Sequence, residues 1–155
     1  MLYRLYQPAD FAQLFAIEEI CFQPPLRFSR AFMRELVESP ASATWVAEEN
    51  GELIGFAIVE LRTSSDPPSA NIPTIEVTPS SRGQGVGAEL LRRIESSARE
   101  AGARTIWLHV DTENSTAIRL YEAHGYMPQG REENFYARHR PAFIYCKPLY
   151  EGGSS

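Results

Sequence analysis

The chain has 155 residues, with 15 Lys and Arg against 20 Asp and Glu, a formal net charge of -5 and 43% hydrophobic residues. This length predicts one compact domain, which we place at residues 1–150, followed by a flexible tail at 151–155. The charged fraction of 23% is ordinary for a globular protein and excludes a wholly disordered chain. The net charge of -5 argues against a general binder of nucleic acids or anionic membranes, because phosphate contacts need clustered Lys and Arg.

The cysteines and the N-terminal residues indicate the compartment. Cys21 and Cys146 are the only cysteines and have no CxxC spacing, so we expect two buried thiols in a reducing cytosol, without a disulfide framework or a metal site. Residues 1–10 contain no charged-then-apolar signal segment, and no apolar run approaches the roughly 18 residues of a membrane span. We therefore expect a soluble, cytoplasmic protein, either a monomer or a homodimer.

The first half of the chain predicts a strand, two helices and a β-hairpin. Apolar residues at helical spacing follow the first strand, and a second helix begins at Ser29 as its N-cap and carries Phe32 and Leu36 inward. Asn50-Gly51 between two apolar runs is the strongest short signal for a hairpin. The predicted elements are a strand at 2–6, a helix from 8 to 22, a helix between 29 and 40, and strands at 44–47 and 53–61.

The second half predicts a β-α-β unit followed by a short helix and two strands. Because a β-α-β connection joins parallel strands, we expect an α/β or α+β fold with a mixed sheet whose centre is parallel. The predicted elements are a strand at 72–77, a helix at 85–101, a strand at 105–110, a helix at 115–124, and strands at 126–131 and 142–147.

The turn between the first strand and the helix of this unit is rich in glycine. Three alternating glycines let the backbone approach an anion closely, and the helix N-terminus offers free N–H groups and about half a unit of positive charge. Arg82 adds a cation, so the turn suits a pyrophosphate rather than merely packing helix on strand. The predicted anion-binding residues are Arg82, Gly83, Gln84, Gly85, Val86, Gly87 and Ala88.

Two other nucleotide-binding motifs compete for this turn. A P-loop is excluded, because no Gly-Lys-Ser/Thr ending is present. Residues 83–88 fit G-x-G-x-x-A, and Asp111 ends the next strand, where a ribose-binding acid belongs, so an NAD-binding oxidoreductase is a real alternative. Against it, residues 78–82 separate the strand from the first glycine, and too few β-α units follow for a second nucleotide-binding half.

Two motifs together carry a resemblance to a known family. Arg82-x-x-Gly85-x-Gly87 resembles the R/Q-x-x-G-x-G/A pyrophosphate loop of the GNAT superfamily of acetyl-CoA-dependent N-acyltransferases, and residues 114–126 resemble its N-x-x-A-x-x-L-Y-x-x-x-G-F/Y motif. The resemblance covers nearly the whole chain and is closest to the protein N-terminal (Nα) and ribosomal-protein alanine acetyltransferases. It implies a single GNAT domain with a mixed sheet of about seven strands, splayed fourth and fifth strands, and about four helices.

The resemblance also implies how acetyl-CoA would be held. The pantetheine arm would lie between the fourth and fifth strands, where the backbone of Ile75, Glu76 and Val77 would meet it and the acetyl group. Pro73 is consistent with a splayed strand, since proline cannot hold a full ladder position. Asn114 would bond near the cofactor arm, and it is equally suited to be the N-cap of the following helix.

Acyl transfer from a thioester to an amine needs a base, an oxyanion donor and an acid for the departing thiolate. By resemblance, Tyr121 occupies the acid position and His109 the position of the base, while Glu76 is a competing base or ammonium anchor. A histidine of pKa about 6.5 deprotonates an α-amine of pKa about 8 far more readily than a lysine of about 10.4. A histidine base therefore favours an α-amine as the acceptor.

Two further segments resemble the Nα-acetyltransferases. Residues 133–136 are similar to an N-Y-Y segment that walls the peptide slot, although Phe135 replaces its first tyrosine, and 138–141 replaces an often acidic stretch. Residues 21–29 are similar to the loop between the first two helices. The acceptor is therefore expected to be a protein or peptide N-terminus; a small amine such as a polyamine, amino sugar or amino acid is the alternative, and a non-catalytic acyl-CoA-binding regulator the third possibility. The predicted acceptor-binding residues are Phe22, Pro24, Phe28, Phe135 and Tyr136.

Overall fold

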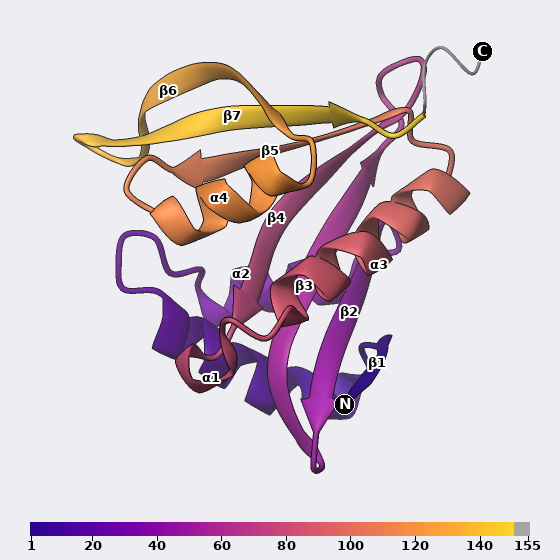
Figure 1. The fold of residues 1–155 in the computed structure, drawn as a ribbon, viewed down its shortest axis with the longest axis vertical. Coiled ribbons are helices and arrows are strands. Elements are labelled where there is room, and N and C mark those ends of the chain that lie inside the picture. Colours follow the sequence, from indigo (N-terminus) through magenta and orange to yellow (C-terminus); the bar gives the residue numbers. More distant parts are fainter. Residues whose placement is uncertain (151–155) are drawn as a thin grey trace.

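Seven strands form one sheet in the order β1-β2-β3-β4-β5-β7-β6 in the computed structural model, which describes residues 1–150 (Figure 1). The tail predicted at 151–155 lies outside the described residues. The strands are β1 (Leu2–Leu5), β2 (Ser42–Glu49), β3 (Glu52–Arg62), β4 (Ser69–Val77), β5 (Thr105–Asp111), β6 (Met127–Ala137) and β7 (Arg140–Pro148). The helices are α1 (Phe11–Cys21), α2 (Arg30–Glu38), α3 (Val86–Glu100) and α4 (Ser115–Ala123), with short 3-10 helices η1 (Pro8–Asp10) and η2 (Pro79–Ser81).

The sheet is mixed, as the sequence predicts. Between neighbouring strands of the described chain, β4 and β5 run parallel, and every other pair is antiparallel. Helix α3 connects β4 to β5, which makes the predicted β-α-β unit. None of the helices in residues 1–150 combines the length and the apolar character that crossing a membrane requires.

Strand β3, predicted at 53–61, is buried on both of its faces over most of its length. Successive side chains of a strand point to opposite faces. Phe56 and Ile58 accordingly pack in one hydrophobic cluster with α1 and α2, whereas Ala57 and Val59 pack in another with α3. The sheet is therefore covered by α1 and α2 on one face and by α3 on the other (Figure 1).

The two central strands separate after only four paired residues. The ladder runs from Ser69 opposite Thr105 to Ile72 opposite Leu108 and stops at Pro73, which has no N–H to donate. Beyond this point β4 pairs with β3, and β5 pairs with β7. The predicted splay of the fourth and fifth strands is confirmed, and it opens a gap at the centre of the sheet.

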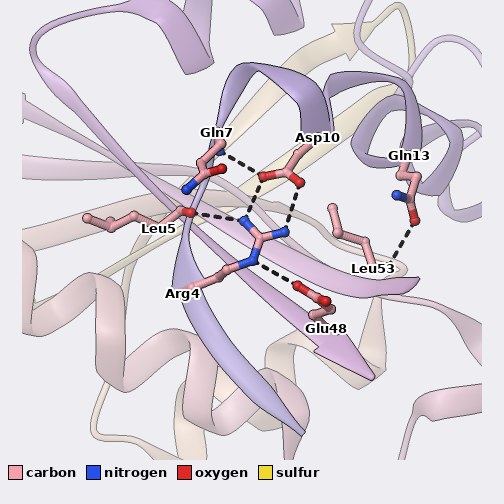
Figure 2. A network of polar contacts seen from close by, with 7 residues as sticks. All are labelled: Arg4, Leu5, Gln7, Asp10, Gln13, Glu48 and Leu53. Carbon is pink, nitrogen blue, oxygen red and sulfur yellow. Dashed lines mark hydrogen bonds and ion pairs between the residues drawn. The ribbon is translucent and has the colours of Figure 1, made fainter. Parts of the chain in front are cut away.

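Polar contacts at the N-terminus join β1 to η1 and β2 (Figure 2). The Arg4 guanidinium donates to both carboxylate oxygens of Asp10, at 2.8 and 2.9 Å, and its Nε donates to Glu48 at 2.8 Å. The Gln7 N–H also donates to Asp10, at 2.7 Å. Arg4 and this backbone donor hold the pKa of the Asp10 carboxyl below its usual value, and the network ties β1 to the residue that precedes α1.

Two packing predictions are wrong. Phe32 does not point inward: it is 44% exposed and lies edge-on against Phe28, while Met33 and Leu36 are buried. Ser29 is the N-cap as predicted, and its side chain accepts from the Phe32 N–H, but Met33 and Leu36, three residues apart, form the buried stripe and leave Phe32 at its side. The Cys21 and Cys146 thiols are free but only half-buried rather than buried.

Candidate active site

A cavity of about 600 Å³ occupies the gap between β4 and β5. Its walls come from the loop after α1, the end of β4, the glycine turn and α4, segments that lie far apart in the sequence. Of the residues predicted to bind the cofactor, those lining this cavity are Ile75, Glu76, Val77, Arg82, Gly83, Gly85, Val86, Gly87, Ala88, Asn114 and Tyr121, whereas Gln84 is not part of the wall. The structure thus brings nearly the whole predicted set together.

The glycine turn presents unused backbone donors to this cavity. Gly83 and Gly85 have φ angles of +78° and +83°, and Gly85 is the N-cap of α3. The first helical bond runs from the Glu89 N–H to the Gly85 carbonyl, and in residues 1–150 no protein acceptor takes the N–H groups of residues 83–88. Free donors at a helix N-terminus suit a pyrophosphate, so the turn fits the cofactor that the sequence predicts.

The guanidinium of Arg82 folds back over the end of β4. Its Nε donates to the Val77 carbonyl at 2.9 Å, and a terminal nitrogen lies 3.5 Å from the Cys21 sulfur. The Cys21 thiol in turn lies 3.6 Å from the same carbonyl. Burial raises the pKa of Cys21 to about 11, so this thiol is uncharged beside the cation at neutral pH. Arg82 therefore braces the turn as well as supplying a positive charge.

The backbone of β4 presents alternate residues to the cavity. The Thr78 N–H donates to Ile54 of β3 at 2.8 Å, so Glu76, two residues earlier and opposite Phe56, also directs its backbone groups toward β3. Ile75 and Val77 direct theirs to the open side, as the bond from Arg82 to the Val77 carbonyl shows. Ile75 and Val77 can therefore meet a pantetheine arm through the backbone, while Glu76 contributes its side chain.

Helix α4 carries Tyr121 into the wall of two adjoining cavities. Besides the large cavity, Tyr121 lines a narrower one of about 60 Å³. The ring is 5% exposed, and burial raises the pKa of its phenol above the ordinary value of 10.0. The helix is oriented by Asn114, whose Oδ1 accepts the Ala117 N–H at 3.1 Å and which also lines both cavities. Asn114 is thus an N-cap, and its side chain borders the cofactor space.

The narrower cavity gathers most of the residues predicted to bind the acceptor. Phe22 and Phe28 from the loop between α1 and α2, and Tyr136 from β6, line it together with His109. Pro24 lines the larger cavity instead. Phe135 lines neither and is 39% exposed. The narrower cavity is therefore bounded by aromatic rings from two distant parts of the chain.

Two acidic residues of the site, Glu18 and Asp111, were given no catalytic role from the sequence. Glu18 of α1 is 1% exposed and lines the narrower cavity. The sequence feature that could have identified Glu18 is the presence of an acid on the apolar face of α1, four residues after Leu14. Asp111, considered only as a ribose ligand, is 5% exposed and accepts from Arg140 at 2.9 Å, which ties the β6–β7 hairpin to the end of β5.

Glu76 is buried and has an unusual carboxyl. It is 3% exposed, and burial together with the neighbouring Glu18 carboxyl raises its pKa well above the ordinary value. Thr74 donates to its Oε2 at 2.7 Å. In the described part of the chain, no three His, Cys, Asp or Glu side chains form a group that could hold a metal ion.

Comparison with known proteins agrees with this geometry. A model of the acetyltransferase (GNAT) family matches residues 10–126. A putative [ribosomal protein bS18]-alanine N-acetyltransferase of Bacillus subtilis is 31% identical over 127 residues, which are 82% of this chain and 81% of that protein. A streptothricin acetyltransferase of Streptomyces lavendulae is 38% identical over 100 residues, which are 64% of this chain but 52% of that protein. The solved structure of Arabidopsis thaliana NAA60 in complex with acetyl-CoA has a TM-score of 0.83 at 21% identity, over 95% of this chain and 97% of that one.

Proposed function

Because the chain belongs to the acetyltransferase (GNAT) family and is an acetyl-CoA-dependent N-acetyltransferase, we propose that its acceptor is the N-terminal α-amine of a protein or peptide. The family, the fold and the cofactor expected from the sequence are confirmed. The dinucleotide alternative is set aside, because the matched family spans the glycine turn that motivated it.

The observation that carries the proposal is the position of Tyr121 in the wall between the two cavities. The larger cavity adjoins the free N–H groups of the glycine turn, so it is the place for acetyl-CoA. The narrower cavity lies on the other side of Tyr121 and is the place for the amine. Donor and acceptor would therefore meet beside one phenol.

The reaction forms a C–N bond between the acetyl carbon and the amine and breaks the C–S bond of the thioester. The amine loses a proton, for which His109 on the acceptor side is the candidate base. Tyr121, kept protonated by its burial, would donate its proton to the departing thiolate. The phenol then recovers a proton from solvent before the next turnover.

The aromatic walls of the narrower cavity support a peptide terminus as the acceptor. The narrower cavity is small, at about 60 Å³, which favours a first residue with a small side chain. The relative from Bacillus subtilis is named for acetylating an alanine, which is such a residue. Phe22, Phe28 and Tyr136 would contact this end, while the rest of the peptide would leave over the exposed Phe135.

A small amine is the second candidate acceptor, favoured by the 38% identity to a streptothricin acetyltransferase. A non-catalytic acyl-CoA-binding regulator is disfavoured, since such a protein would have no need of Tyr121 and His109 at the site. A cytoplasmic location, a lack of nucleic-acid and membrane partners and the oligomeric state stay predictions.

An assay panel tests the acceptor. The purified protein is given acetyl-CoA with peptides bearing a free N-terminal Ala or Ser, the same peptides blocked at the N-terminus but containing Lys, and a set of polyamines, amino sugars and amino acids. Release of free thiol is measured. Selective turnover of the free N-terminal peptides is expected; turnover of small amines alone would overturn the proposal in favour of the second candidate.

A further inference from the structure

Two carboxyl groups lie close together in the interior, between β4 and the helix α1 that leads into the loop before α2. Glu18 of α1 and Glu76 of β4 are 1% and 3% exposed, and Glu18 is near enough to Glu76 to be among the groups that raise its pKa. Glu18 lines the narrower cavity and Glu76 the larger one. The pair therefore lies at the boundary between the proposed acceptor and donor sites.

Each of these carboxyl groups has one oxygen that is bonded and one that is not. Oε2 of Glu18 accepts the Phe28 N–H at 2.8 Å, and Oε2 of Glu76 accepts the Thr74 hydroxyl at 2.7 Å. Oε1 of both residues is buried without a donor in residues 1–150. A buried oxygen without a hydrogen-bond donor lowers the stability of the fold, and here both carboxyl groups contain one.

One proton between the two free oxygens completes the network. Placed on Oε1 of Glu76 and donated to Oε1 of Glu18, it would give every carboxyl oxygen of the pair a partner. Two carboxyl groups in contact cannot both ionise without strong repulsion. Burial and Glu18 raise the pKa of Glu76, while Arg82 and the Thr74 hydroxyl act in the opposite direction.

Two other ionisable groups, Cys21 and Arg82, interact with Glu76, and the narrower cavity that Glu18 lines is also lined by His109, Asp111, Tyr121 and Tyr136. The Cys21 thiol from α1 has a pKa of about 11, raised by its own burial and by Glu76, so it carries no charge at neutral pH. Arg82 stays a cation but is exposed, and its guanidinium is bonded to Val77.

We propose that Glu18 and Glu76 share one proton and act as a positioning pair that holds the loop between α1 and α2 against β4. Glu18 fixes the Phe28 backbone, and Phe28 lines the acceptor cavity. Glu76 is then a hydrogen-bond donor within the wall and not the base of the reaction, because a carboxyl that holds a proton has no place for the proton of the amine. The role in catalysis rests on the proposed acceptor site.

Two substitutions of Glu76 separate the positioning role from that of a base. In Glu76→Gln the amide donates to Glu18 and still accepts from Thr74, whereas Glu76→Ala removes both contacts. We expect the kcat/KM for the peptide to be roughly tenfold higher in the Gln variant than in the Ala variant, through KM, with the KM for acetyl-CoA equal in both. Equal loss of kcat in the two variants, with the peptide KM unchanged, would show that Glu76 is the base and overturn the proposal.

A second measurement needs no acetyl transfer and so survives a failure of the proposed function. Hydrogen exchange of the Phe28 amide is followed against pH by NMR in the wild type, in Glu76→Gln and in Glu19→Gln, a control that makes the same substitution at the exposed neighbour of Glu18 on α1. In the wild type, loss of the shared proton at high pH leaves two carboxylates that repel each other, so the Phe28 amide should exchange faster than at lower pH beyond the normal increase. The control should show the same additional exchange, whereas Glu76→Gln should not. The same pH dependence in all three proteins would overturn the shared proton.

Discussion

The imidazole of His109 lies flat against the ring of Phe135, with the ring centroids 3.9 Å apart and the planes 5° from parallel. Nε2 of His109 is 3.0 Å from a carboxylate oxygen of Glu132 on β6. The histidine is thereby held between β5 and the β6 strand, with one nitrogen engaged. Phe135, which the sequence placed in the wall of the peptide slot, lines neither cavity but stacks on the candidate base.

The role of His109 as the base predicts the pH dependence of turnover. His109→Ala should flatten the alkaline-rising limb of kcat/KM for the peptide, because this limb reports the deprotonation of the base in the free enzyme. The KM for acetyl-CoA should be unchanged, since His109 lines only the narrower cavity. An unchanged pH profile would instead assign deprotonation to Glu76 or to water.

Substitution of Phe135 tests the orienting contact. Phe135→Leu keeps an apolar side chain but removes the stacked ring, so it should lower kcat several-fold without altering the KM for acetyl-CoA. Phe32→Leu is the control: it removes an exposed ring that contacts Phe28 and not His109, so any effect should be on the KM for the peptide, with kcat at the wild-type value. Equal kcat in both variants would contradict an orienting role.

The role of general acid assigned to Tyr121 predicts that its substitution lowers kcat alone. Tyr121→Phe should lower kcat by roughly 100-fold or more, with the affinity for acetyl-CoA nearly intact. Because burial raises the pKa of this phenol, it stays protonated as the pH rises, and no loss of activity at mildly alkaline pH should come from it. Normal turnover in the variant would exclude Tyr121 as the acid.

A substitution in the glycine turn should weaken the binding of acetyl-CoA by more than backbone strain alone would cause. Gly85→Ala places a Cβ at a φ of +83°, which costs roughly 1–2 kcal/mol. Gly51→Ala, at +82° in the β2–β3 turn, carries the same strain away from the site. Urea unfolding should show similar destabilisation, but only Gly85→Ala should raise the KM for acetyl-CoA.

Loss of the cation in this turn should also weaken cofactor binding. Arg82→Ala removes a positive charge and the bond to the Val77 carbonyl, so the KM for acetyl-CoA should rise several-fold. Arg92→Ala removes an exposed arginine of α3 and serves as the control. An equal KM in the two variants would count against a phosphate-binding role for Arg82.

The network of Asp10 predicts how stability changes with pH. Its pKa is lowered from 3.8 by Arg4, so its contribution is present above this value and is lost as the pH falls through the lower, folded-state value. Asp10→Asn should lower the free energy of unfolding by about 2 kcal/mol at neutral pH and less in acid. A constant difference between pH 7 and pH 2, measured by urea unfolding, would contradict this origin.

Local sequence was sufficient for the cofactor half of the site. The glycine turn, the N-cap at Asn114 and the break in pairing at Pro73 each depend on the backbone requirements of a few adjacent residues, so their spacing predicts them. The mixed sheet followed from the order of the elements. These features need no knowledge of which distant residues become neighbours.

Only the tertiary structure decided the acceptor half. The meeting of Glu18 with Glu76, and the ion pair of Asp111 with Arg140, join residues separated by 58 and by 29 positions (76 − 18 and 140 − 111). The charge and burial of each such group depend on a partner that no local pattern specifies. The sequence by itself thus determined the glycine turn, the N-cap and the break in the sheet, whereas packing decided which distant carboxyl groups and aromatic rings become neighbours.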